Sequence, residues 1–146
     1  MLPKRDRQPA PRATHVDYDQ GVFHVVFRTR GGLPLGTVTA DGFVPSSIGE
    51  LLNSAWRKLD DRDDLTVHEF QVMPDHTHGT VELLGGYELG SLVRRLKSQV
   101  TRLAAPNAVR WQRSFYDRRI RTEGDLLNVC EYIRNNPAAW WAKFGG

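Results

Sequence analysis

The stretch Val72–Leu84 places the strongest constraint on the fold of this chain of 146 residues. After the turn residues Pro74 and Asp75, apolar side chains occupy every second position, which is typical of a β-strand leaving a tight turn. Residues Leu65–Met73, before the turn, alternate in the same way. Two alternating runs joined by so short a turn pair as a hairpin. The fold must therefore include an antiparallel sheet.

The same alternation divides the side chains of the second strand between two faces. His76 and His78 share one face with Thr80 and Glu82, whereas Thr77 and the other intervening residues lie on the opposite face. Two imidazoles spaced in this way can converge on one cation or phosphate without backbone distortion. A His-x-His pair on a half-exposed strand also arises by chance, so the spacing alone leaves both interpretations open.

The remaining hydrophobic patterns predict an α+β fold. They indicate a buried strand from Val22, helices over Ser47–Leu59 and Leu89–Leu103, a strand over Ser114–Arg121, and a last helix from Thr122 that ends at Pro137. The order β-α-β-β-α-β-α favours a single domain of ferredoxin-like type. We expect a mainly antiparallel sheet of four to five strands, with the helices packed on one face.

Two spacings give finer predictions within the helices. Ser47 and Glu50 have the spacing of a capping box at the start of the first helix. On the last helix, Tyr132 and Asn136 are four residues apart and lie on one line with Asp125 and Asn128. A phenol and an amide in this position could serve as nucleophile and metal ligand. The alternative is a half-buried tyrosine with its hydroxyl in water.

The composition is ordinary for a globular protein, with 40% hydrophobic and 25% charged residues. One cysteine, Cys130, excludes an internal disulfide and fits a reducing compartment. Because the sequence has neither a membrane-spanning run nor a signal peptide, we expect a cytoplasmic protein without membrane contact. Residues 1–14 are rich in proline and arginine, and we expect a basic disordered arm there, followed by one domain over residues 15–146.

The charge is unevenly distributed along the chain. Residues 1–93 contain 9 Lys and Arg against 13 Asp and Glu, whereas residues 94–146 contain 11 against 4, a net +7. Arg94, Arg95, Lys97 and Arg102 project from the polar sides of the second predicted helix. This basic half predicts a polyanionic partner. A set of solvated helix faces is the alternative.

Three motifs resemble the signatures of the single-tyrosine HUH transposases, above all of their REP-associated branch. They are Met73–His78, Trp111–Asp117 and Glu131–Pro137. The resemblance extends from about Val22 to Trp140, and the motifs stand in the order found in the family. Three ordered motifs are far more specific than one His-x-His pair.

The resemblance implies a function for particular residues. His76 and His78 match the metal-binding histidines of the family, Asn136 matches the position of a third ligand, and Tyr132 matches the nucleophile. The metal would be Mg²⁺ or Mn²⁺. The expected reaction is cleavage and rejoining of single-stranded or hairpin DNA through a 5′-phosphotyrosine link. Whether the chain acts as a monomer or a homodimer stays open.

The resemblance also bears on side chains outside the chemistry. The basic residues Arg94, Arg95, Lys97 and Arg102 are expected to follow the DNA backbone. Trp111, Gln112 and Tyr116 match a motif for which packing is the expected role. Thr77 takes a slot usually filled by a larger hydrophobe, and we expect looser packing there.

Two other functions are compatible with parts of the sequence. A non-catalytic module that binds single-stranded nucleic acid on the same sheet would need neither metal nor nucleophile. A different phosphoesterase is less favoured. His78-Gly79-Thr80 matches one His-x-Thr element of the two-histidine phosphoesterases, but a second element is missing from the sequence, as is the third histidine of the histidine-triad hydrolases.

Overall fold

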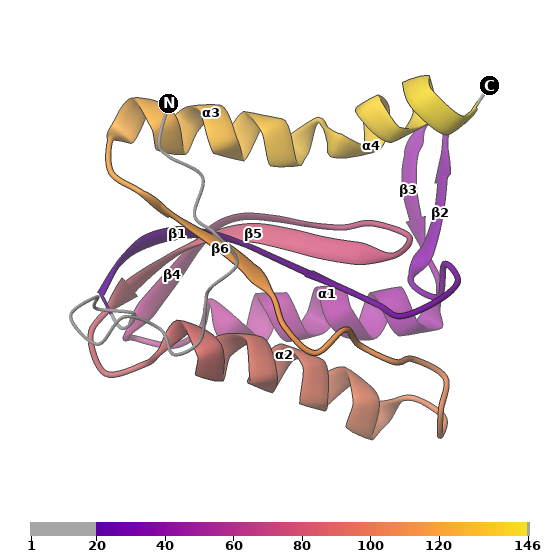
Figure 1. The fold of residues 1–146 in the computed structure, drawn as a ribbon, viewed down its shortest axis with the longest axis horizontal. Helices are drawn as coiled ribbons and strands as arrows, with labels where there is room; N and C mark the ends of the chain where they lie inside the picture. Colours follow the sequence, from indigo (N-terminus) through magenta and orange to yellow (C-terminus); the bar gives the residue numbers. More distant parts are fainter. Residues whose placement is uncertain (1–19, 146) are drawn as a thin grey trace.

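The computed structural model describes residues 20–145, and they form a four-stranded antiparallel sheet with helices on both faces. The strand order is β4-β5-β1-β6 (Figure 1). The sheet strands are β1 (Gln20–Arg28), β4 (Leu65–Val72), β5 (His76–Leu84) and β6 (Tyr116–Ile120). The helices are α1 (Ser47–Leu59), α2 (Leu89–Leu103), α3 (Glu123–Arg134) and α4 (Asn136–Trp140), followed by the π-helical turn η1 (Trp141–Gly145). The α+β prediction is confirmed; the expected arm over residues 1–14 lies outside the described residues.

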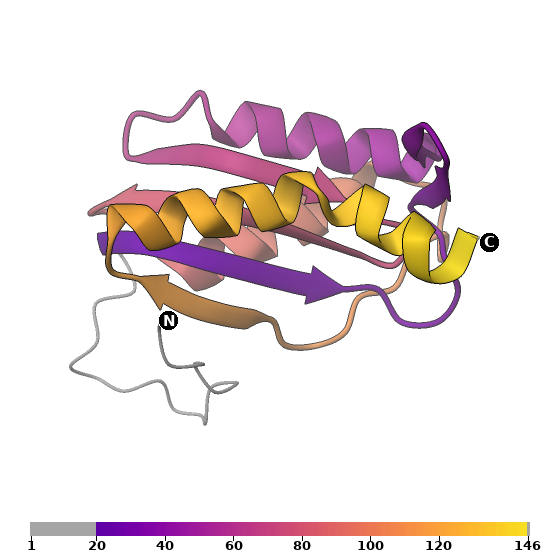
Figure 2. The ribbon, with the colours of Figure 1, turned by 90° about the horizontal axis from the view of Figure 1, so that it is seen from above.

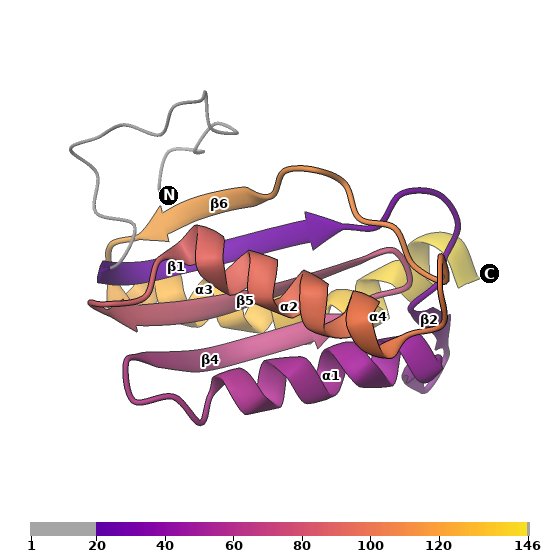
Figure 3. The same ribbon diagram turned by 90° about the horizontal axis from the view of Figure 1, so that it is seen from below.

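The main core lies between the sheet and helices α1 and α2, which run side by side beneath it (Figure 3). On β1 the alternating residues Phe23, Val25 and Phe27 are buried against these helices. The apolar stripes of both helices face the sheet, as their spacing predicts. The N-cap of α1 is Ser46, whose hydroxyl accepts a hydrogen bond from the amide of Gly49 at 3.1 Å. The capping box predicted at Ser47 is therefore wrong by one residue.

Helix α3 crosses the opposite face of the sheet, so the expectation that all helices share one face is wrong (Figures 1 and 2). Its buried residues Val129 and Ile133 pack with Ile120 of β6 in a second, much smaller core. The hydroxyl of Thr122 caps the helix by accepting a hydrogen bond from the amide of Asp125, as its position predicts. The sheet thus has a thick core on one side and the α3 helix on the other.

A short hairpin that the sequence analysis did not predict stands beside the sheet. It consists of β2 (Gly36–Thr39) and β3 (Gly42–Pro45), which pair antiparallel. Asp41 precedes Gly42, whose backbone has a φ of +127° that a side chain would disfavour. Each strand has only four residues, too few for an alternation pattern to be recognised.

Thr77 and Gly79 of β5 form the surface on which Trp56 of α1 packs. The Trp56 indole N–H donates to the Thr77 hydroxyl at 2.9 Å, and that hydroxyl donates to the Gln71 carbonyl at the same distance. The Thr77 side chain is completely buried with both bonds made. The expected looseness at Thr77 is therefore absent, because the hydroxyl satisfies a buried indole that a larger hydrophobe would leave unpaired.

Replacing Gly79 by alanine is expected to lower the free energy of unfolding by about 1–3 kcal/mol, because overpacking forces neighbours to move. A Cβ there would come within 2.7 Å of the Trp56 ring and 2.9 Å of the Glu69 carbonyl. Urea unfolding measures the change. Gly124→Ala on α3 is the control, since nothing lies within 4 Å of its Cβ position, and it should leave the midpoint unchanged or raise it. Equal midpoints for Gly79→Ala and wild type would contradict the packing described.

Candidate active site

The two histidines of β5 and the tyrosine of α3 meet on the α3 face of the sheet. The ring centroids of His76 and His78 are 5.4 Å apart. The Tyr132 ring stands edge-on to the His78 ring with 5.8 Å between centroids and an interplanar angle of 90°. His78 is buried, whereas 59% of Tyr132 is exposed. The structure therefore brings together three of the site residues predicted from the sequence and leaves Tyr132 open to an approaching substrate.

Asn136 joins this group from the start of a different helix. Helix α3 ends at Arg134, and Asn135 has a non-helical conformation with a φ of −88° and a ψ of 1°. The predicted continuous line from Asp125 to Asn136 is therefore interrupted between Tyr132 and Asn136. Pro137, at the first turn of α4, explains the break because its ring restricts the preceding backbone and it has no N–H to continue the ladder.

His24 of β1 is a fourth side chain at the site, and the sequence analysis did not assign it there. Strand β1 pairs with β5 so that His24 lies opposite Thr80, one step along the sheet from His78. The His24 Nε2 is 3.4 Å from the Nδ1 of His78, and the His24 ring lies 6.4 Å from the Tyr132 ring. Alternation puts His24 on the face away from Phe23 and Val25; the β1–β5 pairing, distant in sequence, brings it to His78.

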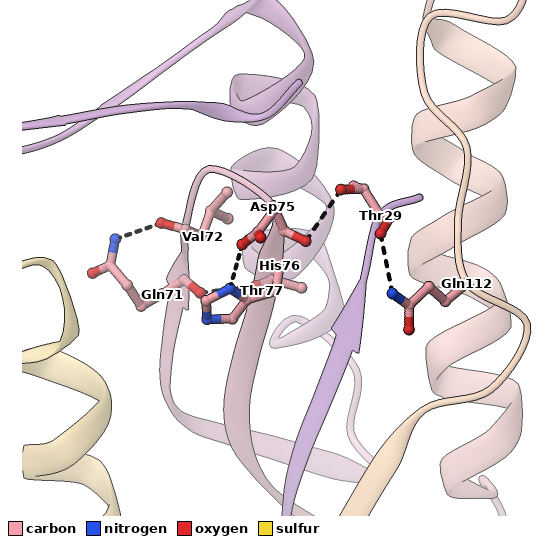
Figure 4. Close-up of polar contacts among 7 residues, drawn as sticks. All are labelled: Thr29, Gln71, Val72, Asp75, His76, Thr77 and Gln112. Atoms are coloured by element: carbon pink, nitrogen blue, oxygen red, sulfur yellow. Dashed lines mark hydrogen bonds and ion pairs between the residues drawn. The ribbon is translucent and has the colours of Figure 1, made fainter. Parts of the chain in front are cut away.

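The turn that carries His76 is held by a group of polar contacts (Figure 4). The Nδ1 of His76 is 2.9 Å from the Asp75 carboxylate. The Thr29 hydroxyl donates to the Asp75 carbonyl, and the Gln112 amide donates to the Thr29 carbonyl. Trp111, which precedes Gln112, packs on Phe27 and bridges to Thr29. Trp111 and Gln112 thus have a structural role next to the site.

Burial keeps the imidazoles of the site neutral. It lowers the pKa of His78 to about 2, helped by His24, His76 and Arg28. Burial, with a smaller effect of Arg118, lowers the pKa of His24 to about 4, and burial also lowers that of His76. The Asn136 side chain instead raises the pKa of both His76 and His78, and its amide therefore lies beside both rings. Neutral imidazoles are the form that binds metal ions.

The polar atoms of the site fit a divalent cation. The Nε2 of His78 and the Oδ1 of Asn136 are buried without a hydrogen-bond partner among the described residues. Such atoms are rare in proteins and call for an explanation, of which an ion is one. If the Nδ1 of His76 donates to Asp75 and that of His78 to His24, each imidazole keeps its Nε2 lone pair for a ligand. Within residues 20–145, no three His, Cys, Asp or Glu side chains are arranged to hold a metal ion together, so a ligand set built on His76 and His78 would need a donor of another kind, such as the Asn136 amide.

The four basic residues predicted to bind DNA lie on α2, and α2 and α3, the helix that carries Tyr132, cover opposite faces of the sheet (Figure 3). Arg94, Arg95 and Arg102 are exposed and line a shallow groove with Ser91, Ser98 and Gln99. Lys97 differs from the other three because its ammonium donates to the Gln112 carbonyl at 2.8 Å. Burial also lowers the pKa of Lys97. The α2 residues do not take part in the site around His78.

The buried imidazoles predict that acidification destabilises the metal-free protein. His24 and His78 bind protons at a higher pH in the unfolded chain, near their ordinary pKa of 6.5, than in the folded one. The free energy of unfolding is therefore expected to fall by about 1–2 kcal/mol per pH unit as the pH drops below about 6. Urea unfolding between pH 7.5 and 5 with a chelator present measures the slope. His24→Gln should reduce the slope, because one of the two buried imidazoles is then absent. A slope in His24→Gln equal to that of wild type would contradict this prediction.

The sequence is similar to those of known proteins. Residues 41–136 match the family described as transposase IS200 like. An uncharacterized protein of Haemophilus influenzae is 29% identical over 121 residues, covering 65% of this chain and 67% of the relative.

Two solved structures have a similar fold. A REP-associated tyrosine transposase bound to a REP hairpin has a TM-score of 0.68 and 22% identity, over 90% of this chain and 74% of that one. A candidate transposase from Deinococcus radiodurans R1 has a TM-score of 0.51 and 18% identity, over 85% and 95% of the two chains. In residues 20–145, none of the helices has the length and apolar character needed to cross a membrane. The family match covers well over half of the chain, and the protein therefore belongs to the IS200-like transposase family.

Proposed function

We propose that this protein cleaves and rejoins single-stranded or hairpin DNA through a covalent link to Tyr132, with Mg²⁺ or Mn²⁺ held by His76, His78 and Asn136. The observation that supports it most is the position of an exposed tyrosine ring, edge-on at 5.8 Å to a buried histidine whose Nε2 has no hydrogen-bond partner in the part of the chain that the structure describes. The family match and a similar structure bound to a REP hairpin support DNA as the substrate.

The proposed step exchanges one phosphate ester for another. The Tyr132 oxygen forms a bond to the scissile phosphorus while the bond from phosphorus to the 3′-oxygen breaks. The phenol proton leaves to solvent and the departing 3′-oxygen takes one up, so the products are a 5′-phosphotyrosine and a free 3′-hydroxyl. A bound divalent cation supplies Lewis acidity that polarises the phosphate. Because the link is itself a phosphodiester, a second 3′-hydroxyl can reverse or redirect the reaction.

His24 and Asp75 act through the two histidines. Each lies against the Nδ1 of one imidazole, and such outer contacts fix the ring and its tautomer. The carboxylate on His76 also increases the basicity of that ring. His24 is neutral, so it orients His78 without adding charge beside it.

Arg28 is the cation best placed for the phosphate. It lies directly opposite His76 in the β1–β5 pairing, and residues opposite each other in an antiparallel pair share a face. Its charge lowers the pKa of His76 and His78, which shows that it is near both rings. Arg28 is exposed, and its side chain forms no hydrogen bond or ion pair with another residue of the range 20–145. A guanidinium in this position can bind two phosphate oxygens at once.

The test is transfer of labelled DNA to the protein. A hairpin with single-stranded flanks, labelled at its 3′-end, is incubated with the protein and Mn²⁺ and then denatured. The proposal expects label in the protein band, because the 5′-phosphotyrosine retains the downstream fragment. Binding of the hairpin without any adduct would instead favour a non-catalytic single-strand-binding module.

The exposed arginines of α2 are proposed as a second contact with the DNA backbone. Arg95→Ala/Arg102→Ala is expected to weaken hairpin binding and to reduce the slope of log affinity against log salt by about 1.4–1.8, which corresponds to two phosphate contacts. Fluorescence anisotropy across a salt series measures both. Arg57→Ala/Lys58→Ala on α1 removes the same charge from another exposed helix end and is the control. Equal slopes in the two double variants would mean that the α2 charges are merely solvated.

A further inference from the structure

The chain that follows Asn136 leads from the metal-binding residues to an exposed aromatic surface. Trp140 lies at the end of α4, and its ring centroid is 6.4 Å from that of His76. The Phe144 ring follows at 4.9 Å from Trp140, and the Lys143 ammonium lies 5.4 Å from the Phe144 centroid. We call Trp140, Lys143 and Phe144 the aromatic shelf. It begins at the site and continues outward from it.

The shelf is exposed although it is made of large apolar rings. Phe144 is 63% exposed and Trp140 is partly exposed. Neither belongs to the two cores of the protein. The turn η1 has π-helical geometry, which is uncommon and occurs often at functional sites. The β2–β3 hairpin lies beside α4 and η1 (Figure 1), so the shelf has a support of folded backbone.

We infer that the aromatic shelf stacks the unpaired bases of the DNA strand next to the scissile phosphate. This inference rests on the proposed function, because it is the site that fixes where the strand passes. Single-strand binders combine aromatic rings that stack on bases with cations that follow the phosphates. The shelf has both features, because Trp140 and Phe144 supply the aromatic rings and Lys143 supplies the cation. Arg28, across from His76, continues the positive charge at the site.

A single-stranded substrate suits this arrangement better than a duplex. Bases in a duplex stack on each other and do not expose their faces to a side chain. A strand whose phosphate lies at His76 would place its next unpaired base near Trp140, which contacts that histidine. Phe144, on the outer side of Trp140, would then meet the base beyond.

The experiment compares wild type with three variants on three hairpins without divalent metal, so that binding is measured apart from cleavage. The hairpins have an unpaired flank, a flank of the same length made of abasic nucleotides, or no flank. For wild type, the natural flank should bind about tenfold more tightly than the abasic one, which keeps the phosphates but lacks the bases. Phe144→Ala should lose most of that difference and bind the blunt hairpin as wild type does.

Leu127→Ala is the matched control, since Leu127 on α3 is also 63% exposed but lies away from the shelf. It should preserve the tenfold difference. Phe144→Trp should preserve it too, because an indole also stacks. If Phe144→Ala binds the flanked hairpin as tightly as wild type, or loses the same affinity for all three hairpins, the inference is overturned. The inference is also overturned if the only effect of Phe144→Ala is a change in the molecular mass measured by sedimentation, because the shelf would then be a contact between two copies of the chain.

These results separate the shelf from the chemistry. Loss of flank discrimination in Phe144→Ala supports the shelf even if wild type forms no covalent adduct. An adduct in wild type together with unchanged discrimination in Phe144→Ala overturns the shelf and leaves the proposed function standing.

Discussion

Replacing Tyr132 by phenylalanine is expected to abolish the covalent adduct with DNA, with a loss of rate of at least about a thousandfold. The substitution removes only the phenol oxygen, the nucleophile in the proposed reaction, and keeps the ring beside His78 and His24. Hairpin affinity should therefore stay within about twofold of wild type. The adduct is measured by denaturing gel with a hairpin labelled at its 3′-end, and the affinity by anisotropy.

Two other tyrosines serve as controls for this result. Tyr87 lies under the Arg62 guanidinium at 4.1 Å, and Tyr116 lies on β6. Tyr87→Phe and Tyr116→Phe should both retain the adduct. If the adduct persists in Tyr132→Phe and disappears in Tyr116→Phe, the assignment of the nucleophile is wrong. Without an adduct in any of these proteins, the binding-module interpretation gains support.

Removal of either histidine from β5 is expected to lower the affinity for Mn²⁺ by at least about a hundredfold. Changing a residue that only contacts a metal ligand costs roughly 10- to 100-fold in metal affinity, and a larger loss is expected here because each substitution would remove a proposed ligand itself. Calorimetry on His76→Ala and His78→Ala measures the affinity, and a chelator should stop adduct formation by wild type until Mn²⁺ or Mg²⁺ is restored. His68→Ala is the control, because His68 bonds to Glu82 away from the site. Equal Mn²⁺ binding by wild type and His78→Ala would overturn the ligand assignment.

Helices α1 and α2 and the central hairpin could be predicted from the sequence because their signals are local, whereas α4 and η1, which extend beyond the predicted helix end at Pro137, were not predicted. The apolar stripes of α1 and α2 repeat over three or more turns, and both predicted ranges match the structure. The hairpin of β4 and β5 follows from alternation on both sides of Pro74 and Asp75. The faces of β5 follow from the same alternation, which is why His76 and His78 were placed together.

The features that were missed depend on contacts between distant segments. His24 is 54 residues from His78, and only the register between β1 and β5 brings the two rings together. Similarly, the apolar stripe of α3 shows that it packs on a sheet but not on which face. The cap at Ser46 was missed because Ser47, and not Ser46, has a glutamate three residues later. In the structure the Ser46 hydroxyl accepts from the Gly49 amide and donates to the Pro34 carbonyl, so Ser46 is the cap.

The unequal size of the two cores gives the two halves of the protein unequal local stability. Helices α1 and α2 are fixed to the sheet by many fully buried side chains, whereas α3 is fixed mainly by Ile120, Val129 and Ile133. Regions with few buried apolar contacts open at a lower free-energy cost than the whole molecule. The helix that carries Tyr132 can therefore detach from the sheet while β1, β5 and their histidines stay folded. Loss of activity on warming would then precede global unfolding and be reversed on cooling.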